Sequence, residues 1–250
     1  MEQITSRKNP YIQYLRALGR ERSLRQQEGE FLCDGRKLLR EAIQCGAEIT
    51  GVLWCDEPDV ELPAAVKQQS APKELLQYAS PMENSPGPLF TVRIRESDPA
   101  AAPERVLVLE NLQDPGNVGT VLRTAAAFRS GLVVLCGSCA DPYNPKCVRA
   151  TMGAIFRQPF AEWSLDELSE RLQSWDMPLY GAALHREAVD IRELQLRKAA
   201  VAVGNEGNGL SEELLDRCHK RLIIPMDPNS ESLNAAVAAS VILWEMSRDN

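Results

Sequence analysis

The chain has 250 residues, of which 44% are hydrophobic and 25% are charged, and its formal net charge is −7. These values indicate a globular protein of one large or two modest domains, and they exclude collagen-like, disordered and disulfide-scaffold classes. The net negative charge also argues against a protein that coats nucleic acid through bulk attraction, although a local basic patch remains compatible with it.

No segment is long and apolar enough for a membrane span. The longest nearly apolar run covers residues 235–244, whereas a span needs roughly 18 residues. The first residues, MEQITSRKNPYIQ, lack the apolar region of a secretory signal. We therefore expect a cytoplasmic protein that contacts no membrane and keeps its seven cysteines as free thiols.

The first part of the chain predicts a small α/β domain over residues 1–95. The elements expected are a helix over 10–24, a strand at 30–34, a helix over 35–45, a strand at 49–54 and a last strand near 89–94. The stretch 56–85 contains several prolines and has weak periodicity. Six basic residues against two acidic ones lie in the first 25 positions, which suits either a phosphate-binding face or a solvated helix surface.

A segment rich in Pro, Asp and Ala (RESDPAAAPER) predicts a linker at 96–104, followed by a second domain over 105–250. There an apolar strand, a turn rich in Gly, Pro or Asn, and a helix follow one another three times, which predicts a parallel sheet with helices on both faces. Ligands of such sheets bind outside the carboxyl ends of the strands, where these turns converge. The last helix, 233–246, is apolar almost all round, so we expect it to be buried, in part against a second subunit.

Three turns carry polar residues that suit a ligand. The loop 204–209 (GNEGNG) differs in glycine order from a dinucleotide-binding loop, and Glu206 would repel a pyrophosphate, so the loop suits a ligand with hydrogen-bonding edges and positive charge, or is only a turn. In the first turn Asn117 either caps the next helix or faces the site, and Arg123 is expected to point toward the same crevice. Ser232 and Asn234 in the third turn are open to the same two interpretations.

Four segments in order resemble the motifs of the SpoU/TrmH-type RNA ribose 2′-O-methyltransferases of the SPOUT class: LENLQDPGNVGTVLRTAAAF, DPYNPKCVRATMGAIFRQPF, VAVGNEGNGLSEELL and IPMDPNSESLNAAVAASVILWE. The segments SRKNPYIQYLRAL and GEFLCDGRKLLREAI resemble the RNA substrate-binding domain, related to a ribosomal-protein fold, that many members carry at the N-terminus. The resemblance implies a deep trefoil knot in the second domain, a homodimer through that domain and S-adenosylmethionine as the cofactor. One departure is Asp227-Pro228, where many relatives have a glycine-containing turn.

The resemblance also implies roles for individual residues. The residues expected to contact the cofactor are Ala183, Leu184, Gly204, Ile224, Met226 and Leu233. The residues expected at the reacting ribose are Asn117, Arg123, Glu206, Ser232 and Asn234. The residues expected to hold RNA are Arg7, Lys8, Asn9 and Arg36. We expect a side chain at Gly204 to take up space that the ligand needs near the backbone.

A guanidinium keeps its proton at any ordinary pH, so we favour Arg123 as a group that positions the ribose and stabilises alkoxide charge over a role as base. The predicted function is 2′-O-methylation of structured RNA, with ribosomal RNA favoured and transfer RNA as the alternative. A catalytically silent RNA-binding protein is the rival, and an oxidoreductase is disfavoured by the glycine order. With two histidines and one closely spaced cysteine pair, we expect no metal site.

Overall fold

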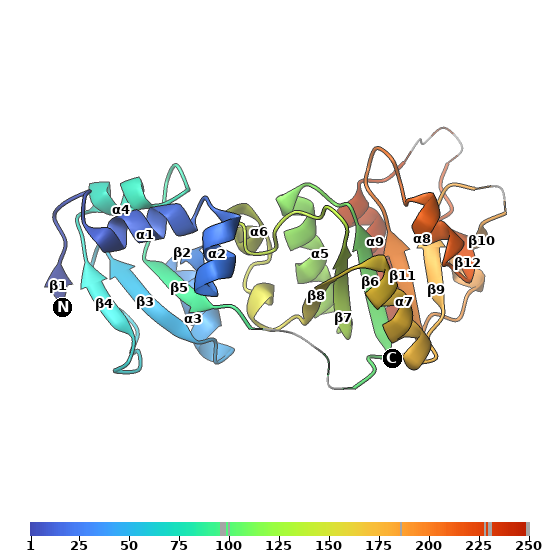
Figure 1. Cartoon of the computed structure of the whole chain (residues 1–250), viewed down its shortest axis with the longest axis horizontal. Coiled ribbons are helices and arrows are strands. Elements are labelled where there is room, and N and C mark those ends of the chain that lie inside the picture. The colour runs from blue at the N-terminus through green and yellow to red at the C-terminus, as the bar shows by residue number, and fades with distance from the viewer. Residues whose placement is uncertain (96–98, 100, 186, 228, 230–231, 249–250) are drawn as a thin grey trace. The chain divides into compact units, whose positions relative to one another are not determined.

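The structure is a computed structural model that describes residues 1–95, 99, 101–185, 187–227, 229 and 232–248. The chain divides into two compact units, drawn in Figure 1. Unit 1 comprises Met1–Arg95 and Asp141–Phe156, and unit 2 comprises Glu96–Ala140 and Arg157–Asn250. Within the described residues, the structure has no helix with the length and apolar character of a membrane-spanning segment.

Unit 1 is built on a mixed five-stranded sheet in the order β1-β4-β3-β5-β2. Its N-terminal elements are β1 (Glu2–Gln3), α1 (Pro10–Leu18), α2 (Arg22–Glu28), β2 (Glu30–Asp34), α3 (Arg36–Gln44), β3 (Ile49–Trp54), β4 (Lys67–Ser70), α4 (Lys73–Ala79) and β5 (Leu89–Arg93). Strand β5 runs antiparallel to β2 and β3, whereas β4 runs parallel to β1 and β3. The helix expected over 10–24 is broken near Gly19. The stretch 56–85, whose periodicity is weak, contains β4 and α4.

Helices α1 and α4 pack together on this sheet. The apolar side of α1 is buried through Ile12, Leu15 and Leu18, which have the spacing of one helical face. They meet Leu75 and Leu76 of α4 in one core cluster. Arg16, the one basic residue within α1, is half-buried and lies over the ring of Tyr78 of α4.

The segment Asp141–Phe156 belongs to unit 1 by its contacts. The domain predicted over 105–250 included this segment, so the boundaries expected from the sequence differ from the observed units here. The segment contains α6 (Pro145–Ala150) and the short helix η1 (Ala154–Phe156), and α6 packs on β2. Phe31 lies 4.9 Å from the ring of Tyr143 and 6.3 Å from that of Phe156, measured between centroids. Arg25 and Asp141, whose side chains are 3% and 10% exposed, form an ion pair of 2.5 Å. These contacts hold the segment on unit 1.

Unit 2 contains a fully parallel seven-stranded sheet in the order β10-β12-β9-β11-β6-β7-β8, as the alternation of apolar strands and helices predicted. Its elements are β6 (Arg105–Glu110), α5 (Pro115–Ala127), β7 (Leu132–Cys136), β8 (Phe160–Trp163), α7 (Leu165–Ser174), β9 (Leu179–Ala182), β10 (Val189–Asp190), η2 (Ile191–Glu193), β11 (Ala199–Val203), α8 (Glu212–Asp216), β12 (Lys220–Ile223) and α9 (Ala235–Ser247).

Helices cover both faces of this sheet (Figure 1). Alternate residues of β6, β7 and β11 pack under α7 and α8 in one core cluster. Helices α5 and α9 pack against each other and on the other face. The α/β class with a parallel sheet between helices is therefore confirmed.

Helix α9 is only partly covered in a single chain. One side is buried through Ala239, Ile242 and neighbouring residues, as predicted. The other side exposes a stripe with i, i+4, i+7 spacing: Val237 at 49%, Val241 at 36% and Trp244 at 57%. The ring of Trp244 contacts Phe128 at the end of α5, with centroids 5.6 Å apart.

Candidate active site

A cavity of about 550 Å³ lies at the carboxyl ends of β9, β11 and β12 in unit 2. Parallel strands bring the loops that follow them to one edge of the sheet, so segments distant in sequence meet there. The lining includes all six residues expected to contact the cofactor: Ala183, Leu184, Gly204, Ile224, Met226 and Leu233. Glu206 and Ser232, two of the residues expected at the reacting ribose, also line it.

The glycine-rich loop 204–209 closes on itself as a rigid turn. Asn205 and Gly209 exchange two backbone hydrogen bonds, of 3.1 and 2.8 Å. A Cβ atom at Gly204 would lie 2.2 Å from the carbonyl carbon and oxygen of Gly209. The structure therefore gives a different reason for this glycine than the one expected, since the space is already taken by the loop's own backbone.

The loop is anchored to the end of β6 by two residues that the sequence reasoning missed. Glu110 is 2% exposed, and its carboxylate accepts hydrogen bonds from the backbone N–H of Ser211 at 2.7 Å and from the Ser211 hydroxyl at 2.6 Å. The amide of Asn205 donates to the carbonyl of Asn111 at 3.0 Å. The signal in the sequence was the polar pair Glu110-Asn111 at the carboxyl end of an apolar strand.

Three of the residues expected at the reacting ribose form a connected set at the edge of the cavity. The side-chain amide of Asn117 donates to Glu206, and the amide of Asn234 donates to Asn117 at 3.4 Å. Asn234 also caps α9, where it accepts from the backbone N–H of Ala236 at 3.0 Å. Asn234 therefore caps α9 and also belongs to the connected set at the edge of the cavity.

The cap of α5 is not Asn117. Asp114 occupies the N-cap position and accepts the backbone N–H of Asn117 at 2.9 Å. The capping interpretation of Asn117 is wrong for this reason, and its side chain is left to bind Glu206.

Arg123 does not line the cavity of its own chain. Arg123 lies six positions after Asn117 on α5, which places the two side chains about 120° apart around the helix axis. Arg123 is exposed, on the side of α5 away from the buried residues Val121 and Leu122. Within the described part of the chain its guanidinium has no ion pair or hydrogen bond. A single chain thus leaves it free to meet another molecule.

The four residues expected to hold RNA divide into two groups. Arg7 and Lys8 are exposed ahead of α1. Asn9 is the N-cap of α1 and accepts the backbone N–H of Tyr11 at 2.9 Å. Arg36 forms ion pairs with Asp56, at 2.6 Å, and with Asp59. Asn9 therefore has a structural role, and the charge of Arg36 is compensated within the unit.

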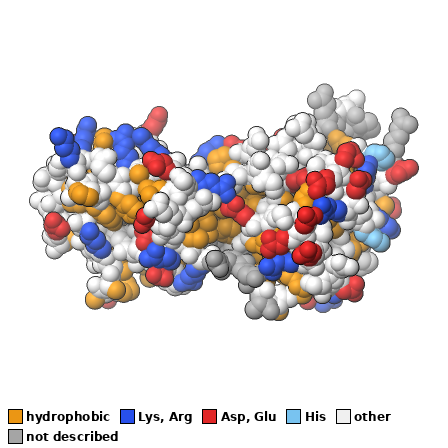
Figure 2. Space-filling model, viewed as in Figure 1, with side chains coloured by type: hydrophobic (Ala, Val, Ile, Leu, Met, Phe, Trp, Pro, Cys, Tyr) orange, Lys and Arg blue, Asp and Glu red, His pale blue; other side chains and the backbone are white. Residues whose placement is uncertain are grey.

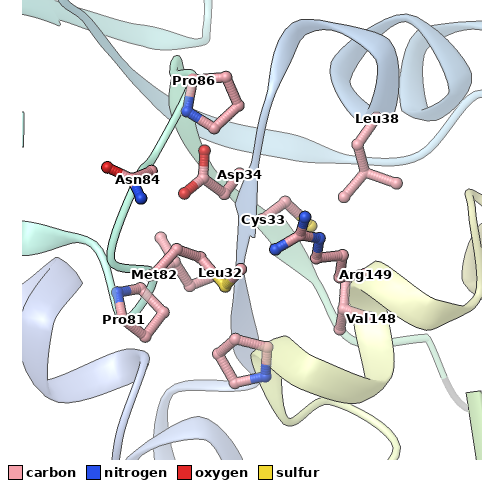
Figure 3. Close-up of a pocket in the computed structure, with 11 residues that line it drawn as sticks. Leu32, Cys33, Asp34, Leu38, Pro81, Met82, Asn84, Pro86, Val148 and Arg149 are labelled. Carbon is pink, nitrogen blue, oxygen red and sulfur yellow. The ribbon is translucent and has the colours of Figure 1, made fainter. Parts of the chain in front are cut away.

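Unit 1 has a smaller cavity of about 100 Å³ beside β2 (Figure 3). Asp34 lies in its wall and accepts hydrogen bonds from the hydroxyls of Ser80 and Ser85, each at 2.8 Å. Burial nevertheless raises the pKa of Asp34, because desolvation outweighs these hydrogen bonds and the nearby charge of Arg149. Arg149 extends from α6 along the same wall (Figure 3).

The lining of the larger cavity fits S-adenosylmethionine. Leu184, although apolar, is 63% exposed at its wall, so a ligand would bury it. The loop backbones offer amide and carbonyl groups for the edges of an adenine, and Glu206 offers one carboxylate for a cationic ligand. A volume of about 550 Å³ lies within the usual range for small-molecule sites, roughly 300–1,000 Å³. Among the described residues, no group of three or more His, Cys, Asp or Glu side chains is arranged to hold a metal ion.

Comparison with known families decides the affiliation of the chain. The SpoU rRNA Methylase family matches residues 104–244, and the MRM3-like substrate binding domain matches residues 9–84. The chain belongs to the SpoU rRNA methylase family. This membership confirms the family predicted from the four motifs, together with the predicted class of enzyme, an RNA methyltransferase.

Relatives of this SpoU-family chain match it over nearly its full length. A 23S rRNA (guanosine(2553)-2′-O)-methyltransferase of Bacillus subtilis is 29% identical over 98% of this chain and 99% of its own length. A 23S rRNA (uridine(2479)-2′-O)-methyltransferase of Streptomyces viridochromogenes is 30% identical over 98% and 91%. The crystal structure of an AdoMet-bound rRNA methyltransferase from Sinorhizobium meliloti, 26% identical, covers 99% of this chain and 98% of its own, with a TM-score of 0.90.

Proposed function

We propose that this protein transfers a methyl group from S-adenosylmethionine to the 2′-oxygen of a ribose in large-subunit ribosomal RNA. One observation carries the proposal: the six residues expected to contact the cofactor line a single cavity, whose edge holds the linked side chains of Glu206, Asn117 and Asn234. The Bacillus and Streptomyces relatives, both named as 23S rRNA 2′-O-methyltransferases, support the choice of RNA. Transfer RNA is the alternative substrate.

The residues of the cavity divide the work of holding the two reactants. When bound, S-adenosylmethionine supplies an electrophilic methyl group on a positively charged sulfur. The backbone of loop 204–209 and the apolar side chains of Leu184 and Leu233 hold the cofactor, and Glu206 offers the carboxylate that suits its positive charge. Ser232 and Asn234 carry polar groups at the same edge and orient the ribose hydroxyl toward the methyl group.

Arg123 acts on the RNA and not on the cofactor. A guanidinium carries a positive charge at any ordinary pH, so Arg123 suits holding the ribose and its phosphate and stabilising the alkoxide charge that develops during transfer. We expect Arg123→Ala to abolish methylation of the RNA while the affinity for S-adenosylmethionine stays near that of wild type. Single-turnover assays with tritiated cofactor and calorimetric titration separate the two effects, and near wild-type transfer would remove Arg123 from the mechanism.

The exposed stripe Val237, Val241 and Trp244 supports a two-fold homodimer through α9. A contiguous apolar surface of this kind is normally covered by another protein surface. Thr124 of α5 contacts Ser240 of α9, with hydroxyl oxygens 3.4 Å apart, so the neighbouring Arg123 lies close to the proposed interface. We propose that Arg123 reaches an active site through this interface.

Light scattering tests the dimer. Wild type should have about twice the chain mass of 27.7 kDa, and Trp244→Asp should have the mass of one chain. Met152, 41% exposed in unit 1, provides the matched control, since Met152→Asp should leave the dimer intact. A monomeric wild type at micromolar concentration contradicts the proposal.

Three further features complete the proposal. We propose that the C-terminal part of unit 2 forms a trefoil knot, which is supported by the return of the chain from β12, near one edge of the sheet, to α9, which packs on the central strands β6 and β11. We propose that unit 1 is an RNA-binding domain related to a ribosomal-protein fold, which the match to a substrate binding domain supports. None of the seven cysteines, all of which lie within the described residues, forms a disulfide, which suits the proposed location in the cytoplasm.

The substrate is tested by mapping ribose methylation in total RNA from cells with and without the gene. We expect one ribose of the large-subunit RNA to lose its methyl group in the absence of the protein, and the purified protein to restore it. A change confined to transfer RNA selects the alternative substrate. If methylation is unchanged in all RNA and the purified protein transfers no methyl group, the result favours a catalytically silent RNA-binding protein.

A further inference from the structure

Unit 1 carries a cluster of four cations around one tyrosine. Tyr78, on α4, has the guanidinium carbon of Arg16 4.0 Å from its ring centroid and that of Arg7 at 4.7 Å. Arg20 follows the end of α1 and its charge acts on Tyr78, whereas Lys8 follows Arg7 in the chain; both are exposed. Lys and Arg side chains gather over α1 and α4 at the upper left of Figure 2. We call these five residues the Tyr78 cluster.

The two guanidiniums are held by the fold and not by chance rotamers. Helix α1 packs on α4, which brings Arg16 over a residue 62 positions further along the chain. The side-chain amide of Gln13 donates to the backbone carbonyl of Arg7 at 2.5 Å and so fixes the segment that carries Arg7. The hydrogen bond of Gln13 and the charges of Arg16, Arg7 and Arg20 lower the pKa of Tyr78, in agreement with a local excess of positive charge.

The charges of the Tyr78 cluster are not compensated by acidic residues. Within the described part of the chain, none of its four cations forms an ion pair. Three other arginines of unit 1 are paired by contrast: Arg36 with Asp56 and Asp59, Arg40 with Asp59, and Arg93 with Glu30. The chain as a whole has a net charge of −7, so a concentrated and unpaired positive patch is an exception to its composition.

We propose that the Tyr78 cluster is a phosphate-binding face that holds the backbone of the ribosomal RNA substrate on unit 1. Two guanidiniums beside one ring repel each other, and cation–π attraction offsets this by only about 0.5–1 kcal/mol each at exposed sites. Successive phosphates of one RNA strand neutralise several cations at once, which a single small anion does not. Tyr78 is a positioning residue here, since its ring restricts Arg16 and Arg7 before RNA binds.

This inference rests on the proposed action on ribosomal RNA and replaces part of the expected RNA-binding set. Arg7 and Lys8 remain in the set, Arg16 and Arg20 join it, and Asn9 leaves it because of its capping role. Arg36 leaves it because of its ion pairs.

The test is the affinity of the full-length protein for deproteinised large-subunit RNA, measured at several salt concentrations. Each lost phosphate contact should lower the slope of log K against log salt by about one. We expect this for Arg16→Gln and for Arg7→Gln, with weaker binding in each. Tyr78→Ala should weaken binding with a smaller loss of slope, whereas Tyr78→Phe keeps the ring and should bind as wild type does. Arg40→Gln removes an exposed but paired cation of the same unit and serves as the matched control.

Two outcomes overturn the inference. One is a wild-type affinity and salt slope in both Arg16→Gln and Arg7→Gln. The other is an equal loss of affinity and salt slope in Arg40→Gln, which would mean that RNA binding depends only on the total charge of the unit. Circular dichroism checks that each variant is folded. The proposed methyl transfer is judged separately, by whether wild type binds S-adenosylmethionine and labels this RNA, so its failure is distinguishable from that of the Tyr78 cluster.

Discussion

Replacing Gly204 with alanine tests whether the cavity depends on the close approach within loop 204–209. The new Cβ would lie 2.2 Å from the carbonyl of Gly209, whereas ordinary contacts begin at 3.4 Å, so the loop backbone must move by about 1 Å or more. That displacement breaks the two backbone hydrogen bonds between Asn205 and Gly209. At about 0.5–1.5 kcal/mol for each hydrogen bond, with about 1–3 kcal/mol for the overpacking, the free energy of unfolding should fall by roughly 2–6 kcal/mol.

Such a loss lowers the melting temperature of a chain of this size by about 4–24 °C. The displaced loop should also bind S-adenosylmethionine about 10- to 100-fold more weakly, which corresponds to roughly 1.4–2.8 kcal/mol. Differential scanning calorimetry of the cofactor-free protein gives the first quantity, and isothermal titration gives the second.

Two other glycines of the same loop provide the controls. A Cβ at Gly207 would meet only the side-chain oxygen of Asn205, at 3.4 Å, so Gly207→Ala should behave as wild type. Gly209 has a φ of +67° and free space around it, so Gly209→Ala should lose about 1–2 kcal/mol through backbone strain alone. If Gly204→Ala matches Gly207→Ala in both measurements, the reasoning fails. If only the cofactor affinity of Gly204→Ala falls, the glycine serves ligand contact as first expected.

Three further changes test interactions within unit 1 or within unit 2. Asp141→Ala leaves the buried guanidinium of Arg25 without its partner and should destabilise unit 1 by about 3–5 kcal/mol in urea unfolding; a loss below about 1 kcal/mol would show that the pair does not hold the segment. Burial raises the pKa of Asp34 above its unfolded value of 3.8, so its contribution to stability is largest below pH 3.8 and is lost as pH rises through the raised folded pKa. Relative to Asp34→Asn, the melting temperature of wild type should therefore fall as pH rises from 3.8 through the folded pKa. A rise in the melting temperature over this pH range would refute the assignment. Ser211→Ala removes the cap of α8 and one hydrogen bond to Glu110, so it should lower the free energy of unfolding by about 1–2 kcal/mol and weaken cofactor binding several-fold. Ser211→Thr should retain both the stability and the affinity. An unchanged Kd in the alanine variant would contradict the anchoring role.

The sequence by itself determined the parallel sheet of unit 2 and the edge where its site lies. Apolar strands such as β6 and β11 alternate with helices, and this pattern is a local property that the chain displays without any tertiary information. Because the carboxyl ends of parallel strands lie at one edge, residues as distant as Ala183 and Leu233 were expected to meet, and both line the cavity. The resemblance to a family supplied which residues of those loops to select.

Only the tertiary structure decided the contacts between polar residues far apart in the chain. Glu110 and Ser211 are 101 positions apart, and no periodicity relates them. The segment Asp141–Phe156 carries no signal that assigns it to unit 1, because that assignment depends on which apolar surface it covers and on the buried pair of Arg25 and Asp141. Charge counts likewise do not reveal which cations are paired. The local pattern determines whether a segment is a helix or a strand, whereas the packing of these elements determines which side chains meet. The anchoring of the cofactor loop and the cluster around Tyr78 both depend on that packing.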